Sequence, residues 1–331
     1  MAALILRRLA AMVVVLLALT AVVFLLRQLT PANPARVALG PRASIGAVEE
    51  YSRELGLDKP LVVQYVIYLN DVVHGDFQVS VRTRRAVSED LAAFVPATME
   101  LALYGILFAG VGGILFGILS VGRWRGSGLV RNIMVVGSSL PSFLLAFGLI
   151  LLFSRQLGWL PGTGRSSLAD MPDGPTQLLT IDALLNGRLD AFWNALQHLI
   201  LPASTIALAS AVAIGRVLRS GLHTSLGSDY VRTARAKGMN ERLLIRRHAL
   251  RNASGPALTM GGLQLGLMFA GVVIVEQIFA WRGIGWYTAQ SIPTNDFAAI
   301  AAVTLILGTV YVVVNTAVDL AQMLADPRIR R

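Results

Sequence analysis

Six apolar stretches, each long enough to cross a lipid bilayer, divide this sequence. They cover residues of about 9–26, 98–121, 130–153, 198–218, 256–280 and 298–324. About 20 apolar residues in a helix match the thickness of the hydrocarbon core, and helices satisfy every backbone polar group there. Hydrophobic residues make up 55% of the chain and charged residues 15%, a balance that fits such a protein. We therefore expect an all-α polytopic membrane protein with six transmembrane helices.

The first stretch has features of a signal peptide, because Arg7 and Arg8 precede an apolar run. The run is longer than a signal sequence needs, and no small-residue cleavage site follows before Pro31. We interpret residues 1–27 as a retained transmembrane helix whose N-terminus is cytoplasmic.

Basic residues indicate the orientation of the six helices. The cytoplasmic side would hold most of the 29 Lys and Arg residues: Arg7, Arg8, Arg123, Arg125, Arg131, Arg216, Arg219, Arg232, Arg235, Lys237, Arg242, Arg246, Arg247, Arg251, Arg328, Arg330 and Arg331. This distribution obeys the positive-inside rule with both termini in the cytoplasm. The net charge of +10 therefore reflects membrane topology, and we expect no nucleic-acid partner.

Enzyme chemistry has little support in the sequence. Cysteine is absent, and neither Lys59 nor Lys237 follows a glycine, so a P-loop for ATP is missing. The four histidines do not show metal-ligand spacing. We expect no catalytic residue, metal or cofactor in this chain.

The polar segments define the remaining organisation. Residues 28–97 predict a helical extracytoplasmic region, with helices near 47–55 and 61–73 joined by a turn at 56–60. Residues 98–325 form a core of five transmembrane helices, whose outer loop at about 155–197 has one surface helix. Residues 326–331 form a basic cytoplasmic tail. Gly113 and Gly117 allow a neighbouring helix to approach closely.

A few polar residues inside the apolar stretches are candidates for a translocation path. Pro141 should kink the third stretch, beside Ser138, Ser139 and Ser142. Hydrogen bonds from these serines to their own helix are the alternative. Glu276, near the outer end of the fifth stretch, is a functional candidate because charge inside a membrane is costly. Its carboxylate could instead reach water or cap a local turn.

The segment 228–252, SDYVRTARAKGMNERLLIRRHALRN, is a long basic interruption between the fourth and fifth stretches. Ser228 or Asp229 can cap a first helix, Gly238 can end it in a left-handed conformation, and Asn240 can cap a second. The pattern predicts two short helices at the membrane surface. A plain positive-inside signal or a DNA-binding helix–turn–helix are the alternatives.

The order of residues in YVRTARAKG and RHALRN resembles the coupling ("EAA") loop of permeases in bacterial ABC importers of the dipeptide/oligopeptide/nickel group. In that family the loop docks on a separate ATPase subunit. The resemblance implies coupling roles for Tyr230, Arg232, Thr233, Ala234, Ala236, Lys237, Gly238 and Glu241. It also implies two ATPase subunits that bind ATP and Mg, a second and usually distinct permease, an extracytoplasmic binding protein, and the bacterial inner membrane as the location.

Other segments extend this resemblance over nearly the whole chain, including ELGLDKPLVVQYVIYL and the PATMEL entry to the second stretch. Arg282 stands where the family usually has proline. The resemblance implies import of di- or oligopeptides, with nickel chelates, glutathione or opine-like compounds as alternatives. A self-contained secondary transporter is a further alternative, although it would normally show charge pairs inside the membrane.

Overall fold

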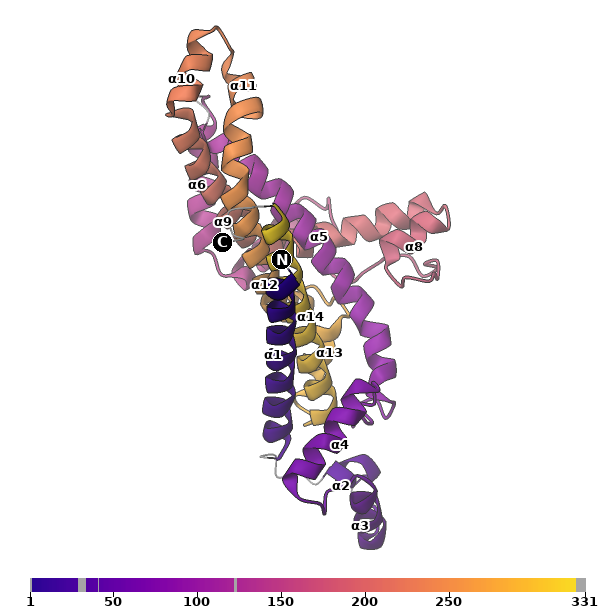
Figure 1. Ribbon diagram of the computed structural model, residues 1–331. Helices are drawn as coiled ribbons and strands as arrows, with labels where there is room; N and C mark the ends of the chain where they lie inside the picture. Colours follow the sequence, from indigo (N-terminus) through magenta and orange to yellow (C-terminus); the bar gives the residue numbers. More distant parts are fainter. Residues whose placement is uncertain (1, 29–33, 41, 122–123, 326–331) are drawn as a thin grey trace. The chain divides into compact units, whose positions relative to one another are not determined.

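The computed structural model describes residues 2–28, 34–40, 42–121 and 124–325, and these residues are helical apart from turns, loops and one isolated bridge between Val79 and Ala86. The expected tail 326–331 lies outside the described residues, as do Arg123 and Pro31. The helices, labelled in Figure 1, are α1 (Ala2–Gln28), α2 (Pro34–Leu39), α3 (Ile45–Glu54), α4 (Leu61–Val73), α5 (Val87–Val121), α6 (Ser127–Ser139), α7 (Ser142–Leu149), the π-helix η1 (Ile150–Gln156), α8 (Leu179–Leu185), α9 (Leu189–Leu226), α10 (Asp229–Ala236), α11 (Glu241–Leu244), the π-helix η2 (Ile245–Ala249), α12 (Leu250–Ile278), α13 (Ile284–Ser291) and α14 (Phe297–Ala325).

Four of the described helices are long and apolar enough to cross a membrane: Ile5–Gln28, Val87–Val121, Leu189–Leu226 and Phe297–Leu320. Two bent pairs, Ser127–Ser139 with Ser142–Gln156 and Ile245–Phe269 with Gly271–Ile278, raise the number to six if each pair counts as one span. The all-α, multi-helix class expected from the sequence is confirmed.

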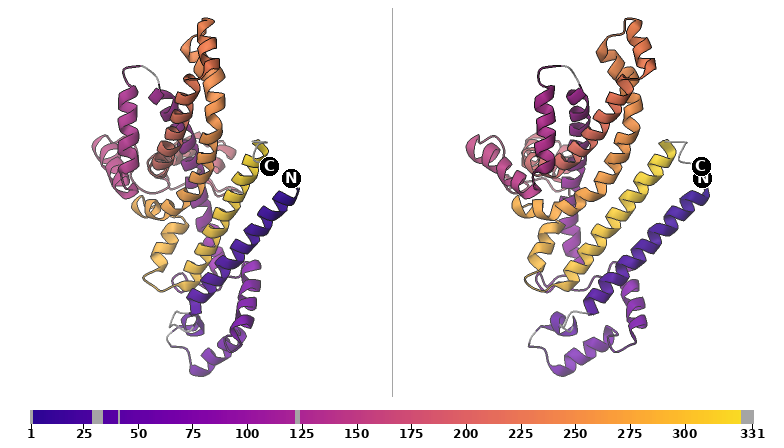
Figure 2. Two further views of the ribbon diagram at one scale, coloured as in Figure 1. Left: turned by 60° about the vertical axis from the view of Figure 1, so that its left-hand side comes forward. Right: turned by 90° about the vertical axis from the view of Figure 1, so that its left-hand side faces the viewer.

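The chain divides into two compact units. The first, which we call unit 1, comprises Met1–Pro96 and Arg282–Thr316, and unit 2 comprises Ala97–Trp281 and Ala317–Arg331. In unit 1, α1 and α14 run antiparallel (Figure 2), and a side chain on Gly308 would collide with Leu19. The apolar side of α4 packs on α1, where Phe24 contacts the rings of Tyr65 and Tyr68. The predicted helices of the 28–97 region are thus present in unit 1.

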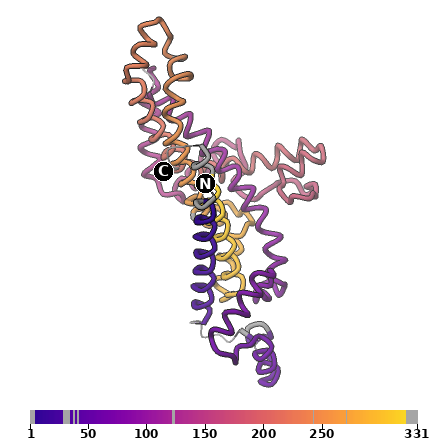
Figure 3. Tube along the Cα trace, in the orientation of Figure 1, coloured from indigo at the N-terminus to yellow at the C-terminus, as the bar shows by residue number. Residues whose placement is uncertain are grey.

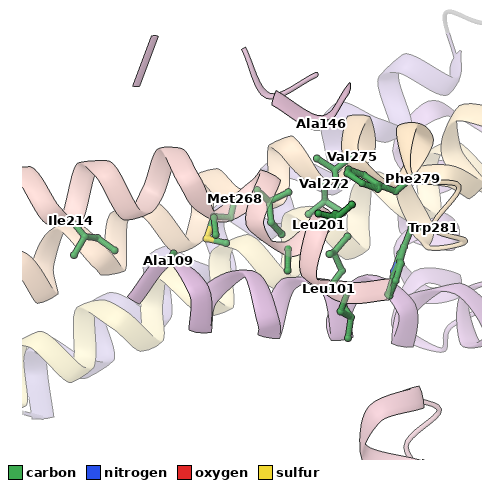
Figure 4. Close-up of a cluster of buried hydrophobic side chains, with 14 of the residues drawn as sticks. Leu101, Ala109, Ala146, Leu201, Ile214, Met268, Val272, Val275, Phe279 and Trp281 are labelled. Carbon is green, nitrogen blue, oxygen red and sulfur yellow. The ribbon is translucent and has the colours of Figure 1, made fainter. Parts of the chain in front are cut away.

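The core of unit 2 lies between α5, α9 and α12. Figure 4 shows its buried side chains, among them Leu101, Leu201, Val275, Phe279 and Trp281, all of which are at most 2% exposed. Most of α9 is buried, so it is the central helix of this unit. The predicted close approach at Gly113 and Gly117 is confirmed, because a Cβ at either position would meet Ile214 or Leu218 of α9 at 2.6–2.7 Å.

Several helix limits differ from the sequence-based expectation. α5 begins at Val87, eleven residues before the expected start at 98, and passes through Pro96. α9 begins at Leu189 and ends at Leu226, so it extends beyond the apolar stretch 198–218 at both ends. Hydropathy marks only the part of a helix suited to lipid, whereas packing continues a helix into polar sequence.

The third apolar stretch bends sharply at Pro141, which confirms the expected kink, and the bend is a break between two helices. α6 ends at Ser139 and α7 begins at Ser142, with an angle of 119° between the two segments. Leu140 is extended, with φ −81° and ψ 126°, because the ring of Pro141 disfavours helical geometry in the preceding residue. Pro141 also lacks the N–H that would continue α6.

Candidate functional site

The segment 228–252 has the helix–glycine–helix structure that its sequence predicts. Ser228 is the N-cap residue of α10, and Gly238 follows the helix with φ +85°, in the left-handed region. The Oδ1 of Asn240 accepts a hydrogen bond from the N–H of Leu243 at 2.8 Å and caps α11. Ser228 itself makes no capping bond to α10, since its hydroxyl donates back to the carbonyl of Ser225.

The second helix of this segment is not a separate surface helix, which corrects the sequence-based expectation. α11, η2 and α12 follow one another without a break. α12 lies side by side with α9, and α10 and α11 form the end of the resulting helical arm (Figure 1, Figure 3). Leu244, Ala249, Ala253 and Ala257 are all buried along it. Leu244 and Ala249 are five residues apart, whereas the later buried positions are four apart. The longer spacing spans η2, where the π-helical turn holds one more residue than an α-helical turn.

Side-chain contacts fix the end of this arm, which we call the coupling arm (residues 228–252). The Nδ2 of Asn252 donates to the hydroxyl of Tyr230 at 2.7 Å, which ties α10 to the start of α12. Arg235 donates to both carboxylate oxygens of Glu241, at 2.6 and 3.3 Å, and so spans the turn at Gly238. Val231, within α10, is fully buried.

The electrostatics of the coupling arm follow from these contacts. The hydrogen bond to Glu241 raises the pKa of Arg235. Burial acts to raise the pKa of Tyr230, but hydrogen bonds with Asn252, Ser225 and Ser228 outweigh it and the net shift is downward. Both side chains are thus held in polar contacts that orient them at the surface.

Most of the predicted coupling residues are exposed. Tyr230, Arg232, Thr233, Ala236, Lys237, Gly238 and Glu241 are exposed, and Ala234 is half-buried. Arg246, Arg247 and Arg251 add exposed positive charge along the same arm. An exposed basic surface on a helical arm of fixed local geometry is suited to binding an acidic cleft on another protein.

The serine candidates for a translocation path lie at the α6–α7 break. The hydroxyls of Ser138 and Ser139 both donate to the carbonyl of Val135, at 2.8 and 3.1 Å, so hydrogen bonding within the helix does occur. Ser138 also accepts a hydrogen bond from Arg216 of α9 at 2.6 Å. Ser142 is the first residue of α7, directly after Pro141. The structure therefore brings Ser138 and Arg216 together, a pairing that the sequence did not predict.

Glu276 lies in a different contact. Its side chain is fully buried and accepts a hydrogen bond from the hydroxyl of Thr98 at 2.5 Å. The interpretation that this carboxylate reaches water is therefore wrong. The apolar core that includes Phe279 and Trp281 buries this end of α12. The hydropathy of a single helix cannot reveal burial by other elements.

Sequence reasoning missed a second buried carboxylate, that of Glu100. One oxygen accepts from the N–H and hydroxyl of Thr180, both at 2.8 Å, and the other accepts from Arg165 at 2.7 Å. The Arg165 guanidinium lies 5.5 Å from the centre of the Trp281 ring. The only signal was a charged residue at the start of the second apolar stretch, since its partners lie 65 and 80 residues away.

An open apolar groove runs along α5, α9 and α12. Its volume is about 520 Å³, and Ile106, Gly110, Leu218, Leu258 and Leu265 are among the residues that line it. Among the described residues, no group of three or more His, Asp or Glu side chains could hold a metal ion. The groove suits an apolar partner, not a charged ligand.

Comparisons with known proteins cover almost the whole chain. A family model described as "Binding-protein-dependent transport system inner membrane component" matches residues 109–331, and the model of its N-terminal region matches residues 1–102. The chain is 43% identical, over 97% of its length and 95% of the relative, to the probable D,D-dipeptide transport system permease protein DdpB of Escherichia coli K12. It is 37% identical to the dipeptide transport system permease protein DppB of Alkalihalophilus pseudofirmus, over 98% of each chain. It is 35% identical to the glutathione transport system permease protein GsiC of Salmonella typhimurium, again over 98% of each chain. The chain therefore belongs to the family of binding-protein-dependent transport system inner membrane components.

Proposed function

We propose that this chain is the permease subunit of an ATP-driven ABC importer and forms half of a translocation path for di- or oligopeptides. The observation that carries the proposal is the 43% identity, over nearly the full length, to a permease named for D,D-dipeptide transport. A second relative named for dipeptide transport matches over 98% of each chain. In this role the chain is a transport component and not an enzyme.

Six transmembrane spans in the bacterial inner membrane form part of the proposal. They are α1, α5, the bent pair α6–η1, α9, the bent pair within 245–278, and α14. Both termini and the coupling arm then face the cytoplasm, and residues 28–97 face outward. The concentration of Arg and Lys on the cytoplasmic side supports this orientation. The domain limits are 1–27, 28–97, 98–325 and 326–331.

The coupling arm would dock on an ATPase subunit, which supplies ATP and Mg because this sequence has no P-loop. Its exposed Arg232, Thr233, Ala236 and Lys237 form the contact surface, with Gly238 as the turn. The Tyr230–Asn252 and Arg235–Glu241 contacts support this role, since they join the arm's end to α12 and let force on α10 reach the spans.

The apolar groove along α5, α9 and α12 would face a second, homologous permease. Leucine and isoleucine line it, and a surface of this kind inside a membrane suits helix packing. Ser138, Ser139, Pro141, Ser142 and Glu276 remain candidates for the path. Glu276 would act from a buried position, by holding Thr98 and α5 in place.

Co-purification and uptake together test the proposal. The chain, tagged and extracted from its own host in mild detergent, should bring with it a second permease and one or two P-loop ATPases. The complex, reconstituted in liposomes with its binding protein, should import dipeptides with ATP. Glutathione is the competing cargo, given the relative named for it. Purification of the chain alone as an active transporter would refute the proposal, and preference for glutathione would refute the peptide assignment.

A further inference from the structure

A short loop in unit 1, residues 79–86, is anchored by two buried carboxylates. Asp296 accepts hydrogen bonds from the Ser80 hydroxyl at 2.5 Å, from the N–H of Arg82 at 3.2 Å and from the N–H of Ala299 at 3.3 Å. The side chain of Asp296 is fully buried. It therefore holds the loop against the first turn of α14.

Asp90 is the second anchor. Its carboxylate accepts from the hydroxyl of Thr83 at 2.5 Å, from Arg85 at 2.6 Å and from the hydroxyl of Tyr287 at 2.9 Å. Each of the two buried acids thus receives three hydrogen bonds from other groups. Neither carboxylate accepts a hydrogen bond from the side chain of Arg82.

Arg82 lies over an aromatic surface, and no carboxylate of the described residues forms an ion pair with it. Its guanidinium carbon lies 5.0 Å from the centre of the Tyr287 ring and 5.9 Å from that of Trp286. Its Nε and Nη2 are buried and have no hydrogen-bond partner within the described part of the chain. Phe94 stacks under Tyr287 with a centroid distance of 5.0 Å, which fixes the aromatic surface.

A second arginine shares the same tryptophan. The guanidinium carbon of the exposed Arg282 lies 5.8 Å from the centre of the Trp286 ring. No hydrogen bond or ion pair of its side chain is found within residues 2–28, 34–40, 42–121 and 124–325. Two guanidinium groups therefore lie near the Trp286 indole, while the nearby Asp90 and Asp296 accept hydrogen bonds from other groups.

The energetic balance favours an added anion at this place. Contact with an aromatic face compensates a cation only in part, and a buried N–H without an acceptor costs free energy. Two uncompensated cations near one ring also repel each other. A carboxylate between the two guanidinium groups offsets their repulsion, and its two oxygens match the planar fork of a guanidinium at the N–H groups that remain accessible.

We propose that Arg82 and Arg282, on Trp286, form a carboxylate-binding site that receives the C-terminal carboxylate of the imported peptide on the outer side of the membrane. The inference rests on the proposed function for the cargo and on the proposed orientation for the side. The aromatic surface then lies beside the apolar part of the peptide, and selectivity for a free carboxyl group is a property of the permease as well as of the binding protein.

Fluorine NMR of the assembled complex in nanodiscs, labelled with 5-fluorotryptophan, tests the site directly. The Trp286 resonance is assigned by its absence from the spectrum of the Trp286→Phe variant. Alanyl-alanine is added without binding protein, and its C-terminal amide is added in a parallel titration. We expect the dipeptide to shift the Trp286 resonance and the amide to leave it unchanged.

The matched control is Arg84→Gln, since Arg84 is exposed, lies in the same loop and has no cation–π contact among the described residues. Arg82→Gln and Arg282→Gln should each weaken the response by about tenfold or more, as expected for a lost charge-assisted hydrogen bond, and Arg84→Gln should not. An equal response to the amide, or an unchanged response in both variants, would overturn the inference.

Two further outcomes separate this inference from the proposed function. A Trp286 shift caused only by peptide-free binding protein would assign the arginines to protein docking and overturn the peptide site. Dipeptide uptake in liposomes without any Trp286 response would leave the importer function intact and refute the site. Absence of uptake, with the carboxylate response present, would refute the peptide importer and with it the assigned cargo of the site.

Discussion

Replacement of Glu100 by Gln should destabilise unit 2, because this side chain joins three elements of that unit. Glu100 lies in α5, Thr180 in α8 and Arg165 in the loop between η1 and α8. The carboxylate is 1% exposed, and the side chain of Arg165 is 19% exposed. Glutamine keeps the shape but puts an amide NH₂ or a neutral oxygen in the place of one anionic oxygen.

The magnitude follows from what remains after the change. If the glutamine amide oxygen keeps the two hydrogen bonds from Thr180, the amide NH₂ faces the Arg165 guanidinium. Both groups are donors, so no hydrogen bond forms between them. Arg165 then loses its only counter-ion among the described residues, while its Nε already lacks a hydrogen-bond partner there. Removal of one member of a buried ion pair lowers the free energy of unfolding by about 3–5 kcal/mol. Because Arg165 is partly exposed, we expect a loss of about 3 kcal/mol.

Reversible unfolding of the purified protein by SDS in mixed micelles measures this loss. The matched control is Arg188→Gln, whose ion pairs with Asp170 and Asp190 are exposed, and we expect no measurable change there. A loss below about 0.5 kcal/mol in Glu100→Gln would refute the reasoning. Equal losses in the two variants would show that burial of the pair does not determine its contribution.

Three further predictions concern packing, the coupling turn and pH. Gly113→Ala should destabilise unit 2 by about 1–3 kcal/mol in the same unfolding assay, because its Cβ would lie 2.7 Å from Ile214, whereas Gly110→Ala, with open space at that position, should not. Gly238→Ala should cost about 1 kcal/mol in the coupling turn through its left-handed φ of +85°, with no steric clash, and reduce stimulated ATPase activity about fivefold. Gly238→Asn should retain more activity because asparagine tolerates that conformation, and equal activity of the alanine variant and the wild type would exclude a role for the turn geometry. Burial raises the pKa of Tyr68 from 10.0 to about 12, so the folded state holds this proton more tightly; its contribution to stability is complete below about pH 10 and is lost as pH rises to about 12. Tyr68→Phe should remove that alkaline step from the stability profile, and an unchanged step would assign it to another group.

Local features of this protein were predictable from short stretches of sequence. Gly238 and Asn240 gave the turn of the coupling arm, because left-handed glycine and asparagine capping depend only on a few neighbouring residues. The helix at 61–73 was predicted with its observed limits, since the turn that ends at Pro60 marks its start. The Gly113–Gly117 contact face was also visible, although its partner helix was not.

Features that depend on residues far apart in the sequence were not predicted correctly. Pro141 predicted a kink in the third stretch, but a proline alone does not specify the size of the bend, which is 119°. Glu276 was expected near water, yet Thr98, 178 residues away in sequence, and the surrounding core bury it. Glu100 was quoted within the PATMEL motif but given no role, because both of its partners belong to an outer loop with no recognisable motif.

The sequence alone determined the membrane class, the helical content and the family, since apolar length, backbone hydrogen bonding and an ordered motif are properties of contiguous residues. The tertiary structure alone decided which charges have partners. Asp90, Asp296 and Glu100 each accept three hydrogen bonds, whereas Arg82 and Arg282 both lie near Trp286 and form no ion pair within the described part of the chain. The free energy of a buried charge depends on groups brought together from distant parts of the chain, so only the folded structure shows where an anion would be bound.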